Sequence, residues 1–428
     1  MKMQIITSII LMLVLFMIRS PISITMFLVA IIYFFNTGMN PGQLLGIVMA
    51  RLYASGNLVA IPLFIFTANI MNSGRVTDHM FTFCKAVIGK RKGALAYLNV
   101  LISLIFAGMT GSAVADVSGI GLMEIREMEK DGYDVPFSCA VTSASSVMGP
   151  IFPPSIPMVV YALYAETSIG KLFMGGMIPA IMIGIGLCLY IRYISAKRNY
   201  PAGIKFSRKD FWKYTLEALP ALMTPIILLT GIYTGIVTAT EAGVIAASWA
   251  ILVSIYPYRC ITLKSLLKCI ADTVKQTGTI IAIVTGAFAL SHIVTLSGLG
   301  KAICNGFLSL TTNKYVFLFI INVLFILLGM IFDTQVLQLV FLPLVLPIVN
   351  ALGINLVHFG VLISVNMMIG MTTPPYGVLC FISAGLGKVS IQSVFKEVIP
   401  MTAIMIGILL LITYIPGFVT FIPNLLIR

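Results

Sequence analysis

The residues best suited to bind an ion or a small anion lie at four Gly- and Pro-rich breaks in otherwise apolar segments. Residues 94–123 are interrupted by AGMTGS, 138–164 by GPIFPPSIP, 315–350 by GMIFDT and 356–382 by GMTTPPYG. Helix N-termini at such breaks present unpaired N–H groups and a partial positive charge, which suit a carboxylate. Unwound carbonyls and hydroxyls suit Na⁺. The breaks therefore predict a binding site for a small anion and a cation.

Two of these segments are predicted to be hairpins and two to be broken helices, with each hairpin tip meeting one break. The candidate site residues of the first pair are Gly108, Thr110, Gly111, Ser112, Ser145, Ser146, Pro153, Pro154 and Ser155. Those of the second pair are Gly329, Asp333, Thr334, Gly370, Thr372, Thr373, Pro374 and Pro375. Glycine allows the close backbone approach that such a junction needs.

Asp333 is the most informative single residue. It lies within the apolar stretch 316–349, where a charge is costly unless it is paired. A Na⁺ ligand or a coupled proton site would explain it, and so would a helix N-cap, since aspartate accepts N–H bonds well. The two roles are compatible. Asp116, on the returning arm of the first hairpin, is predicted to have either a functional role or a buried structural hydrogen bond.

The other polar residues indicate no catalysis. Glu241 is predicted to be solvated or to cap a helix, and the isolated His79, His292 and His358 to be structural. The seven cysteines show no CxxC pair and no ligand spacing. No GxSxG, phosphate-loop, HExxH or kinase motif is present. The sequence therefore predicts no enzyme and no cofactor, and it argues against a pump subunit with its own nucleotide site.

The composition indicates a multi-pass membrane protein. Of 428 residues, 59% are hydrophobic and 10% are charged, against about 25% charged residues in a typical soluble domain. Residues 1–18 could pass for a signal peptide, but no small-residue cleavage site follows, and a first membrane span is predicted instead. The candidate spans are 3–18, 22–36, 58–72, 172–195, 216–236, 240–257, 276–296 and 397–421.

The basic residues orient the chain in a membrane. A net charge of +13 would suit nucleic acid, but the cations lie in short loops and form no stripe with aromatic residues, so nucleic-acid binding is not expected. Loops 73–93, 192–215 and 258–275 are rich in Lys and Arg, whereas 162–171 and 297–314 are poor. Cytoplasmic loops carry this excess, so the three basic loops are predicted to be cytoplasmic. The segment 1–60 is not oriented by this pattern.

An internal repeat relates the two pairs of breaks. A single ungapped offset places Gly108-Met109 on Gly329-Met330, Pro153-Pro154 on Pro374-Pro375, and Pro179 on Pro400. Five predicted crossings separate the two hairpins, an odd number, so the second repeat is upside down. We expect an all-α polytopic membrane protein with inverted repeats, two re-entrant helical hairpins and two broken helices, an architecture typical of secondary transporters. Within a single permease domain, 1–428, repeat one covers about 94–195, repeat two about 315–421, and scaffold helices about 1–93 and 200–296.

The same motifs carry a resemblance to a known family. GSAVADVSGIG at 111–121, GPIFPPSIPMVVYA at 149–162, DTQVLQLVFLPLVLP at 333–347 and NLVHFGVLISVNMMIGMTTPPYG at 355–377 resemble the large membrane subunit of tripartite ATP-independent periplasmic (TRAP) transporters. The resemblance runs from about residue 40 to the end of the chain. The sequence departs from the family pattern at Thr110, where serine is more frequent, and at Tyr376, where a small aliphatic residue is usual. Both departures concern substrate size.

The resemblance implies secondary active uptake of a small organic anion by Na⁺ symport and an elevator motion. It implies a periplasmic substrate-binding protein and a separate small four-helix membrane subunit as partners, in the inner membrane of a bacterium. Family ion and substrate positions match Ser112, Asp333 and Thr373, so Na⁺ is expected near these residues. Sialic acids, four-carbon dicarboxylates and sugar acids are all compatible substrates. The alternatives are a stand-alone anion carrier, a channel or membrane scaffold, and a membrane-embedded enzyme.

Overall fold

The protein is built from α-helices. The computed structural model describes residues 7, 8, 10–12, 14, 15, 18, 20–72 and 74–426. Within these residues the only β-type pairing is an isolated bridge between Lys92 and Ala202. Half of the residues in the predicted span 3–18 lie outside the described residues.

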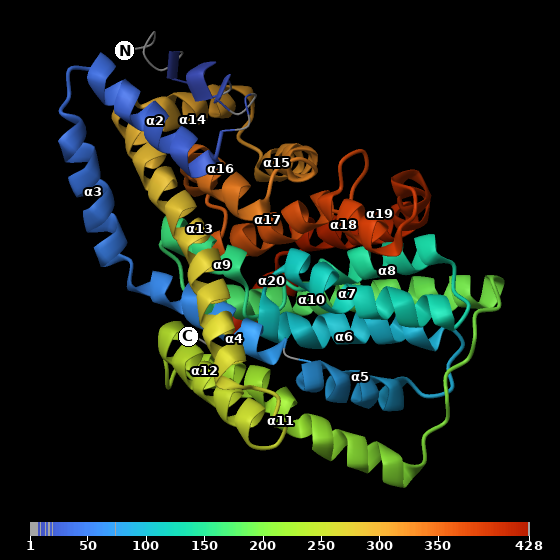
Figure 1. Ribbon diagram of the computed structural model, residues 1–428. Helices are drawn as coiled ribbons and strands as arrows, with labels where there is room; N and C mark the ends of the chain where they lie inside the picture. The colour runs from blue at the N-terminus through green and yellow to red at the C-terminus, as the bar shows by residue number, and fades with distance from the viewer. Residues whose placement is uncertain are drawn as a thin grey trace.

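The described helices follow one another through short connections (Figure 1). In chain order they are α2 (Ile22–Asn36), α3 (Pro41–Ala54), η1 (Gly56–Val59), α4 (Ala60–Met71), α5 (Gly74–Ile88), α6 (Ala94–Thr110), α7 (Ala113–Lys130), α8 (Val135–Ser146), α9 (Ile156–Ala165), α10 (Ile169–Lys197), α11 (Arg208–Tyr233), α12 (Ala239–Ile255), α13 (Leu263–Leu296), α14 (Leu299–Leu310), α15 (Lys314–Gly329), α16 (Thr334–Ala351), α17 (Leu356–Gly370), α18 (Val378–Gly387), α19 (Ile391–Tyr414) and α20 (Gly417–Leu426).

Five of the described helices, α10, α11, α13, α16 and α19, are long and apolar enough to cross a membrane. Two bent pairs raise that number to seven if each pair is one span: α3 with η1 and α4, bent by 68°, and α14 with α15, bent by 120°. Many large apolar side chains on these helices are exposed, among them Leu189 at 62% and Leu327 at 53%. A surface of this kind fits lipid rather than water, so the chain is a multi-pass membrane protein.

Two sets of five helices have matching boundaries. The first half, α6–α10, and the second half, α15–α19, each consist of a hairpin, a broken helix and a long helix. Helices α7 and α8 begin at Ala113 and Val135, and α16 and α17 begin at Thr334 and Leu356, shifted by the same offset that separates the two Gly-Met pairs. Prolines inside α10 and α19 are likewise equivalent. The Pro-Pro peptide bonds of the two broken helices are both cis.

The halves pack against each other in opposite directions. Along α10 and α19, Arg198 pairs with Glu397, Gly186 faces Ile404 and Ile408, and residue numbers rise along one helix as they fall along the other. Helix α8 contacts α18, and its counterpart α17 contacts α9; likewise α7 contacts α18, and α16 contacts α9. Figure 1 shows α18 and α19 lying along α8, with α6, α7 and α10 beyond it. Antiparallel packing of corresponding helices is what an inverted repeat requires.

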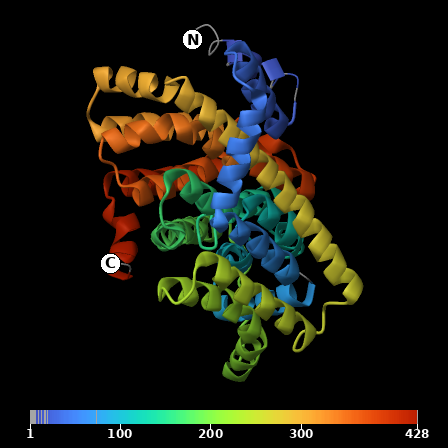
Figure 2. The ribbon, with the colours of Figure 1, turned by 90° about the vertical axis from the view of Figure 1, so that its left-hand side faces the viewer.

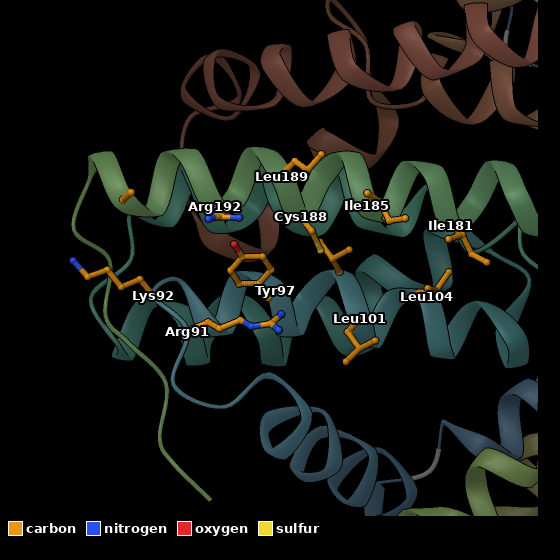
Figure 3. Close-up of a pocket in the computed structure, with 13 residues that line it drawn as sticks. Arg91, Lys92, Tyr97, Leu101, Leu104, Ile181, Ile185, Cys188, Leu189 and Arg192 are labelled. Carbon is orange, nitrogen blue, oxygen red and sulfur yellow. The ribbon is translucent and has the colours of Figure 1, made fainter.

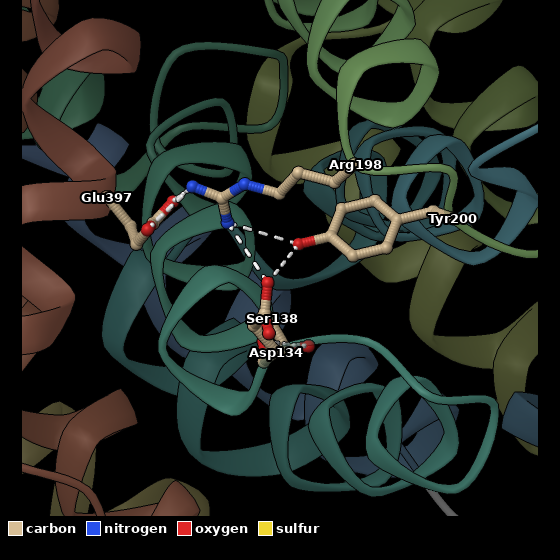
Figure 4. A network of polar contacts seen from close by, with 5 residues as sticks. All are labelled: Asp134, Ser138, Arg198, Tyr200 and Glu397. Carbon is tan, nitrogen blue, oxygen red and sulfur yellow. Dashed lines mark hydrogen bonds and ion pairs between the residues drawn. The ribbon is translucent and has the colours of Figure 1, made fainter.

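A polar network around Arg198 joins the halves at one end (Figure 4). The guanidinium donates to both carboxylate oxygens of Glu397, at 2.8 and 2.9 Å, to Asp134 Oδ2 at 3.2 Å and to the hydroxyl of Tyr200 at 3.1 Å. Tyr200 in turn donates to Asp134 Oδ2 at 2.7 Å. The hydrogen bonds that Arg198 donates to the Glu397 carboxylate raise the pKa of the guanidinium above its ordinary value. Both bonds to Glu397 come from Nη2 of Arg198, and both side chains are partly exposed, so this ion pair is a modest link between α10 and α19.

The remaining helices surround the two halves. Helix α13 runs obliquely across the molecule, with α2, α3 and α4 against it (Figure 2). Close approach of α2 is possible because residue 286 is glycine: a Cβ there would lie 2.9 Å from the carbonyl oxygen of Ser23. Helix α4 also packs on α12, and α11 on α12 and α5.

Several predicted loops are helices in the structure. Loop 73–93 contains α5, loop 258–275 contains the start of α13, and loop 297–314 contains α14. Helix α3 was not predicted at all, and the predicted span 397–421 is divided between α19 and α20. The reason is physical: the prediction rests on long apolar runs, which short or amphipathic helices lack. The prediction for Glu241 is confirmed, since it forms a capping box with Thr238 at the start of α12.

Candidate transport site

The first hairpin tip turns at Gly111 and Ser112. Gly111 has a φ of +58°, a left-handed conformation that suits glycine, and a Cβ there would lie 2.6 Å from the carbonyl oxygen of Pro154. Ser112 is the N-cap of α7, and its hydroxyl accepts from the Ala115 N–H at 3.3 Å. The tip is thus in direct contact with the first broken helix, as predicted. Gly108, one turn earlier, faces Pro225 of α11 and the Pro153 carbonyl.

The second hairpin tip is built like the first, but its second helix begins with a different N-cap residue. Asp333 is the N-cap of α16, and its Oδ1 accepts from the Gln335 N–H at 2.9 Å. Gly329 and Gly370 lie so close that a Cβ on Gly370 would be 2.8 Å from the Gly329 carbonyl carbon. Thr334 is buried, with its hydroxyl 3.6 Å from the Met371 sulfur. This tip also meets its own broken helix.

The two tips share one small cavity. Ser112 and Asp333, which occupy equivalent positions in the two repeats, both line it. Its volume is about 30 Å³, enough for a water molecule or an ion but not for an organic anion. The N-termini of α7 and α16 end at this cavity, so partial positive charge from two helices meets the carboxylate of Asp333. Its lining is completed by Gly111, Ala113, Val114, Pro150, Pro157, Thr334, Gln335, Met368 and Met371.

The first broken helix contacts its hairpin tip mainly through backbone atoms and less through side chains. Ser155 caps α9: its hydroxyl donates to the Pro150 carbonyl and accepts from the Met158 N–H at 3.3 Å. Ser146 donates to the Ser143 carbonyl at 2.9 Å. Pro153 and Pro154 are buried next to the first tip. Their carbonyls, not their rings, face Gly108 and Gly111.

Three of the predicted site residues donate their hydroxyl hydrogen bonds to backbone carbonyls of α6 or α17. Thr110 donates to the Phe106 carbonyl at 3.2 Å. Thr372 and Thr373 both donate to the Ile369 carbonyl, at 2.9 and 2.7 Å. Thr373 does not line the cavity that Ser112 and Asp333 share. Beyond it, Pro374 is partly buried and Pro375 is exposed.

Ser145 belongs to a buried polar network in the first half. Its hydroxyl donates to Asn99 Oδ1 at 2.6 Å and lies 3.1 Å from the hydroxyl of Ser103. Ser103 donates to Asp116 Oδ2 at 2.8 Å, and Asn99 Nδ2 donates to Thr142 at 2.7 Å. The network ties α6, α7 and α8 together. Asp116 therefore has the structural hydrogen bond that was one of its two predicted roles.

The second half has its own buried network, which was not predicted. Asn366 Nδ2 donates to Asn322 Oδ1 at 2.8 Å, and Asn322 Nδ2 donates to Thr413 at 2.8 Å. Gln338 Nε2 donates to Ser364 at 3.3 Å. Asn322 and Asn366 are the single amides inside α15 and α17. A buried amide in a membrane segment needs a partner, but the sequence does not show which one.

Glu124 is a further residue that was missed. It lies on α7 with 3% of its surface exposed, and its Oε1 has no hydrogen-bond partner within the described part of the chain. Arg126 and Lys130 follow it on the same helix, a composition typical of a solvated helix end. No group of three or more His, Cys, Asp or Glu side chains that could hold a metal ion occurs among the described residues.

Comparison with known proteins gives the family. Residues 9–418 match the profile described as "Tripartite ATP-independent periplasmic transporter, DctM component". The sialic acid TRAP transporter large permease protein SiaM of Vibrio cholerae is 34% identical over 368 residues, covering 86% of each chain. The C4-dicarboxylate TRAP transporter large permease protein DctM of Pseudomonas aeruginosa is 31% identical over 367 residues, again 86% of each chain.

The fold is similar to a solved transporter structure. The YdaH transporter of Alcanivorax borkumensis superimposes with a TM-score of 0.63 and 14% sequence identity, over 88% of this chain and 87% of that chain. At this identity the likeness concerns the fold alone. With a family match along nearly its whole length and more than 30% identity to two large permeases, the chain belongs to the DctM family of TRAP transporters and is a transporter permease, not an enzyme.

Proposed function

We propose that this chain is the membrane permease of a secondary active uptake system in which a small organic anion with a carboxylate group enters together with Na⁺. Family membership supports the transporter class. The names of two relatives give sialic acid and C4-dicarboxylates as their substrates, and both are carboxylates. A carboxylate also fits helix N-termini of the kind that end at the tip cavity.

The observation that carries the proposal is the convergence of Ser112 and Asp333 on one cavity. Each hairpin tip supplies one N-cap side chain, so a ligand between them is held by both halves. An anionic oxygen from Asp333 and a hydroxyl from Ser112 are hard ligands that suit Na⁺. Thr373 is placed away from this cavity, and we assign the cation to Ser112 and Asp333 with backbone carbonyls from the tips.

An organic anion needs a larger space than the 30 Å³ of this cavity. The substrate site therefore opens when the two tips separate from each other. Close backbone contacts, Gly111 with Pro154 and Gly329 with Gly370, tie each tip to its own broken helix. We propose that each hairpin and its broken helix move as one body, in an elevator motion against the surrounding helices.

Two protein partners complete the system. A periplasmic substrate-binding protein delivers the anion, and a small four-helix membrane subunit packs against the permease. The chain resides in the inner membrane as a multi-pass protein, with the basic loops in the cytoplasm.

Reconstitution tests the proposal directly. Proteoliposomes that contain the permease and the small subunit, with an inward Na⁺ gradient, should take up a radiolabelled carboxylate only after the binding protein is added. Replacing the Na⁺ gradient with K⁺ is the control and should abolish uptake. Rapid uptake without binding protein would instead indicate a stand-alone carrier, and uptake that ignores Na⁺ would contradict symport.

A further inference from the structure

A large groove lies between α6 and α10, away from the tip cavity. Its volume is about 710 Å³, and Figure 3 shows Tyr97 and Cys188 lying between the two helices. Its lining contains Arg91, Lys92, Tyr97, Val100, Leu101, Leu104, Ile181, Gly184, Ile185, Cys188, Leu189, Arg192 and Ala196. No function described above uses this groove.

One end of the groove is strongly basic. Arg91 and Lys92 precede α6, and Arg192 lies near the end of α10, so the three cations come from two separate elements. In Figure 3, Arg91 and Arg192 lie on either side of Tyr97. No Asp or Glu lines the groove. Across the described residues, none of the three cations forms an ion pair. The basic end is therefore free to neutralise an external anion.

The rest of the groove is apolar and has the length of one lipid leaflet. It runs along α10 from Arg192 back to Ile181, which is about 16 Å at roughly 1.5 Å per residue. The hydrocarbon core of a bilayer is about 30 Å thick, so the apolar part spans about half of it. Ile181, Ile185 and Leu189 are all exposed along this path. The aromatic ring of Tyr97 lies between Arg91 and Arg192 at the basic end of the groove (Figure 3), and such rings commonly lie at a membrane surface.

We propose that this groove binds an anionic phospholipid of the leaflet that the basic loops face. The phosphate is held by Arg91, Lys92 and Arg192, and an acyl chain lies along Leu101, Leu104 and Ile185. Basic pockets between membrane helices on the cytoplasmic side suit such headgroups. The transported anion does not explain the apolar length, and an uncharged lipid does not explain three unpaired cations. The proposal is independent of the transported substrate and of Na⁺ coupling.

Lipid retention by the purified full chain, together with any subunit that copurifies, tests the proposal. Native mass spectrometry is performed after incubation with phosphatidylglycerol or with zwitterionic phosphatidylcholine. The wild-type protein should retain phosphatidylglycerol in preference to phosphatidylcholine. The affinity of the Arg91→Gln/Arg192→Gln variant for phosphatidylglycerol should be about 30-fold lower, since each cation near the surface contributes about 1 kcal/mol of binding free energy. Arg91→Lys/Arg192→Lys should keep most of the preference, because the charge is retained.

Two further variants separate the headgroup from the acyl chain. Ile185→Trp fills the apolar part at a position that is 55% exposed, so it should reduce lipid retention without disturbing the core. Lys205→Gln/Arg208→Gln removes two cations that lie on the same predicted side of the membrane but outside the groove. This variant should retain as much phosphatidylglycerol as the wild-type protein.

Four results would overturn the proposal. The first is equal retention of phosphatidylglycerol by wild type and Arg91→Gln/Arg192→Gln. The second is equal affinity for the two lipids. The third is displacement of the lipid by millimolar inorganic phosphate, which would reduce the basic end to a simple anion site. A cross-link from Cys188, which lines the groove, to a copurified protein subunit in place of lipid would also contradict it.

Discussion

The two halves of the molecule share a backbone but differ in where they place a carboxylate. Ser112 and Asp333 are equivalent caps at the two tips, and Asp116 is equivalent to Leu337. The first half thus has its carboxylate one helical turn further along the returning arm than the second. There Asp116 is buried and accepts a hydrogen bond from Ser103. Asp333 instead lines the cavity between the tips.

This difference assigns different roles to the halves. A carboxylate held by a buried hydroxyl inside a three-helix network stabilises the hairpin. A carboxylate at a tip, which makes one backbone hydrogen bond and faces a cavity, can also ligate a cation. The shared geometry therefore builds the cavity, and the second half supplies its charge.

The opposite orientation of the halves predicts an all-or-none labelling result. Lys205 and Asn305 are both exposed and lie in segments predicted to be on opposite sides of the membrane. In a chain without its native cysteines, Lys205→Cys should be protected from an impermeant maleimide in intact cells, and Asn305→Cys should be labelled. Labelling of both positions from outside would contradict the inverted arrangement.

The next largest effect is expected from the glycines that join each tip to its break. Gly370→Ala places a Cβ 2.8 Å from the Gly329 backbone, and Gly111→Ala places one 2.6 Å from the Pro154 carbonyl. Each should lower stability by about 1–3 kcal/mol and reduce uptake strongly, since the halves are built alike. Thermal unfolding in detergent measures the loss of stability, and transport assays at equal expression measure the loss of uptake.

Gly407→Ala is the matched control, because a Cβ there meets no atom within 4 Å. It should leave uptake unchanged and should not lower stability; as a Gly→Ala change inside α19 it should raise the free energy of unfolding by about 0.5–1 kcal/mol. Normal uptake by Gly370→Ala would show that the second tip does not need its close contact with the broken helix.

The smallest effect is expected where the halves are joined by Arg198. Glu397→Gln removes the ion pair between α10 and α19. Both side chains are partly exposed, and Arg198 keeps its ion pair with Asp134. The free energy of unfolding should therefore fall by about 1 kcal/mol or less. Thermal unfolding should show a small decrease for Glu397→Gln and none for Lys130→Gln, whose side chain is 75% exposed. Equal melting temperatures for wild type and Glu397→Gln would show that the network does not hold the halves together.

The tips could be predicted from sequence because Gly, Pro and N-cap residues act locally. Gly111 and Asp333 fix where one helix ends and the next begins, whatever packs around them. The rotation of a helix about its axis is different, because tertiary packing decides it. For this reason Ser145 contacts Asn99 and Ser103, and neither Ser145 nor Thr373 lines the tip cavity. The amide network of Asn322 and Asn366 joins residues far apart in sequence and leaves no local pattern.

The Na⁺ dependence of uptake tests the central claim, that Asp333 provides the charge of a cation site formed by both tips. Asp333→Asn preserves the shape and the cap, since asparagine caps a helix about as well as aspartate, but it removes the charge. Asp116→Asn is the matched control, because it removes a carboxylate that is already held by Ser103.

Uptake is measured against Na⁺ concentration for wild type and both variants at equal membrane expression. We expect half-maximal uptake by Asp333→Asn to need at least about tenfold more Na⁺, which corresponds to the loss of about 1.4 kcal/mol of binding free energy, whereas Asp116→Asn keeps the wild-type midpoint. Superimposable Na⁺ curves for wild type and Asp333→Asn would contradict the account and leave Asp333 as a helix cap only.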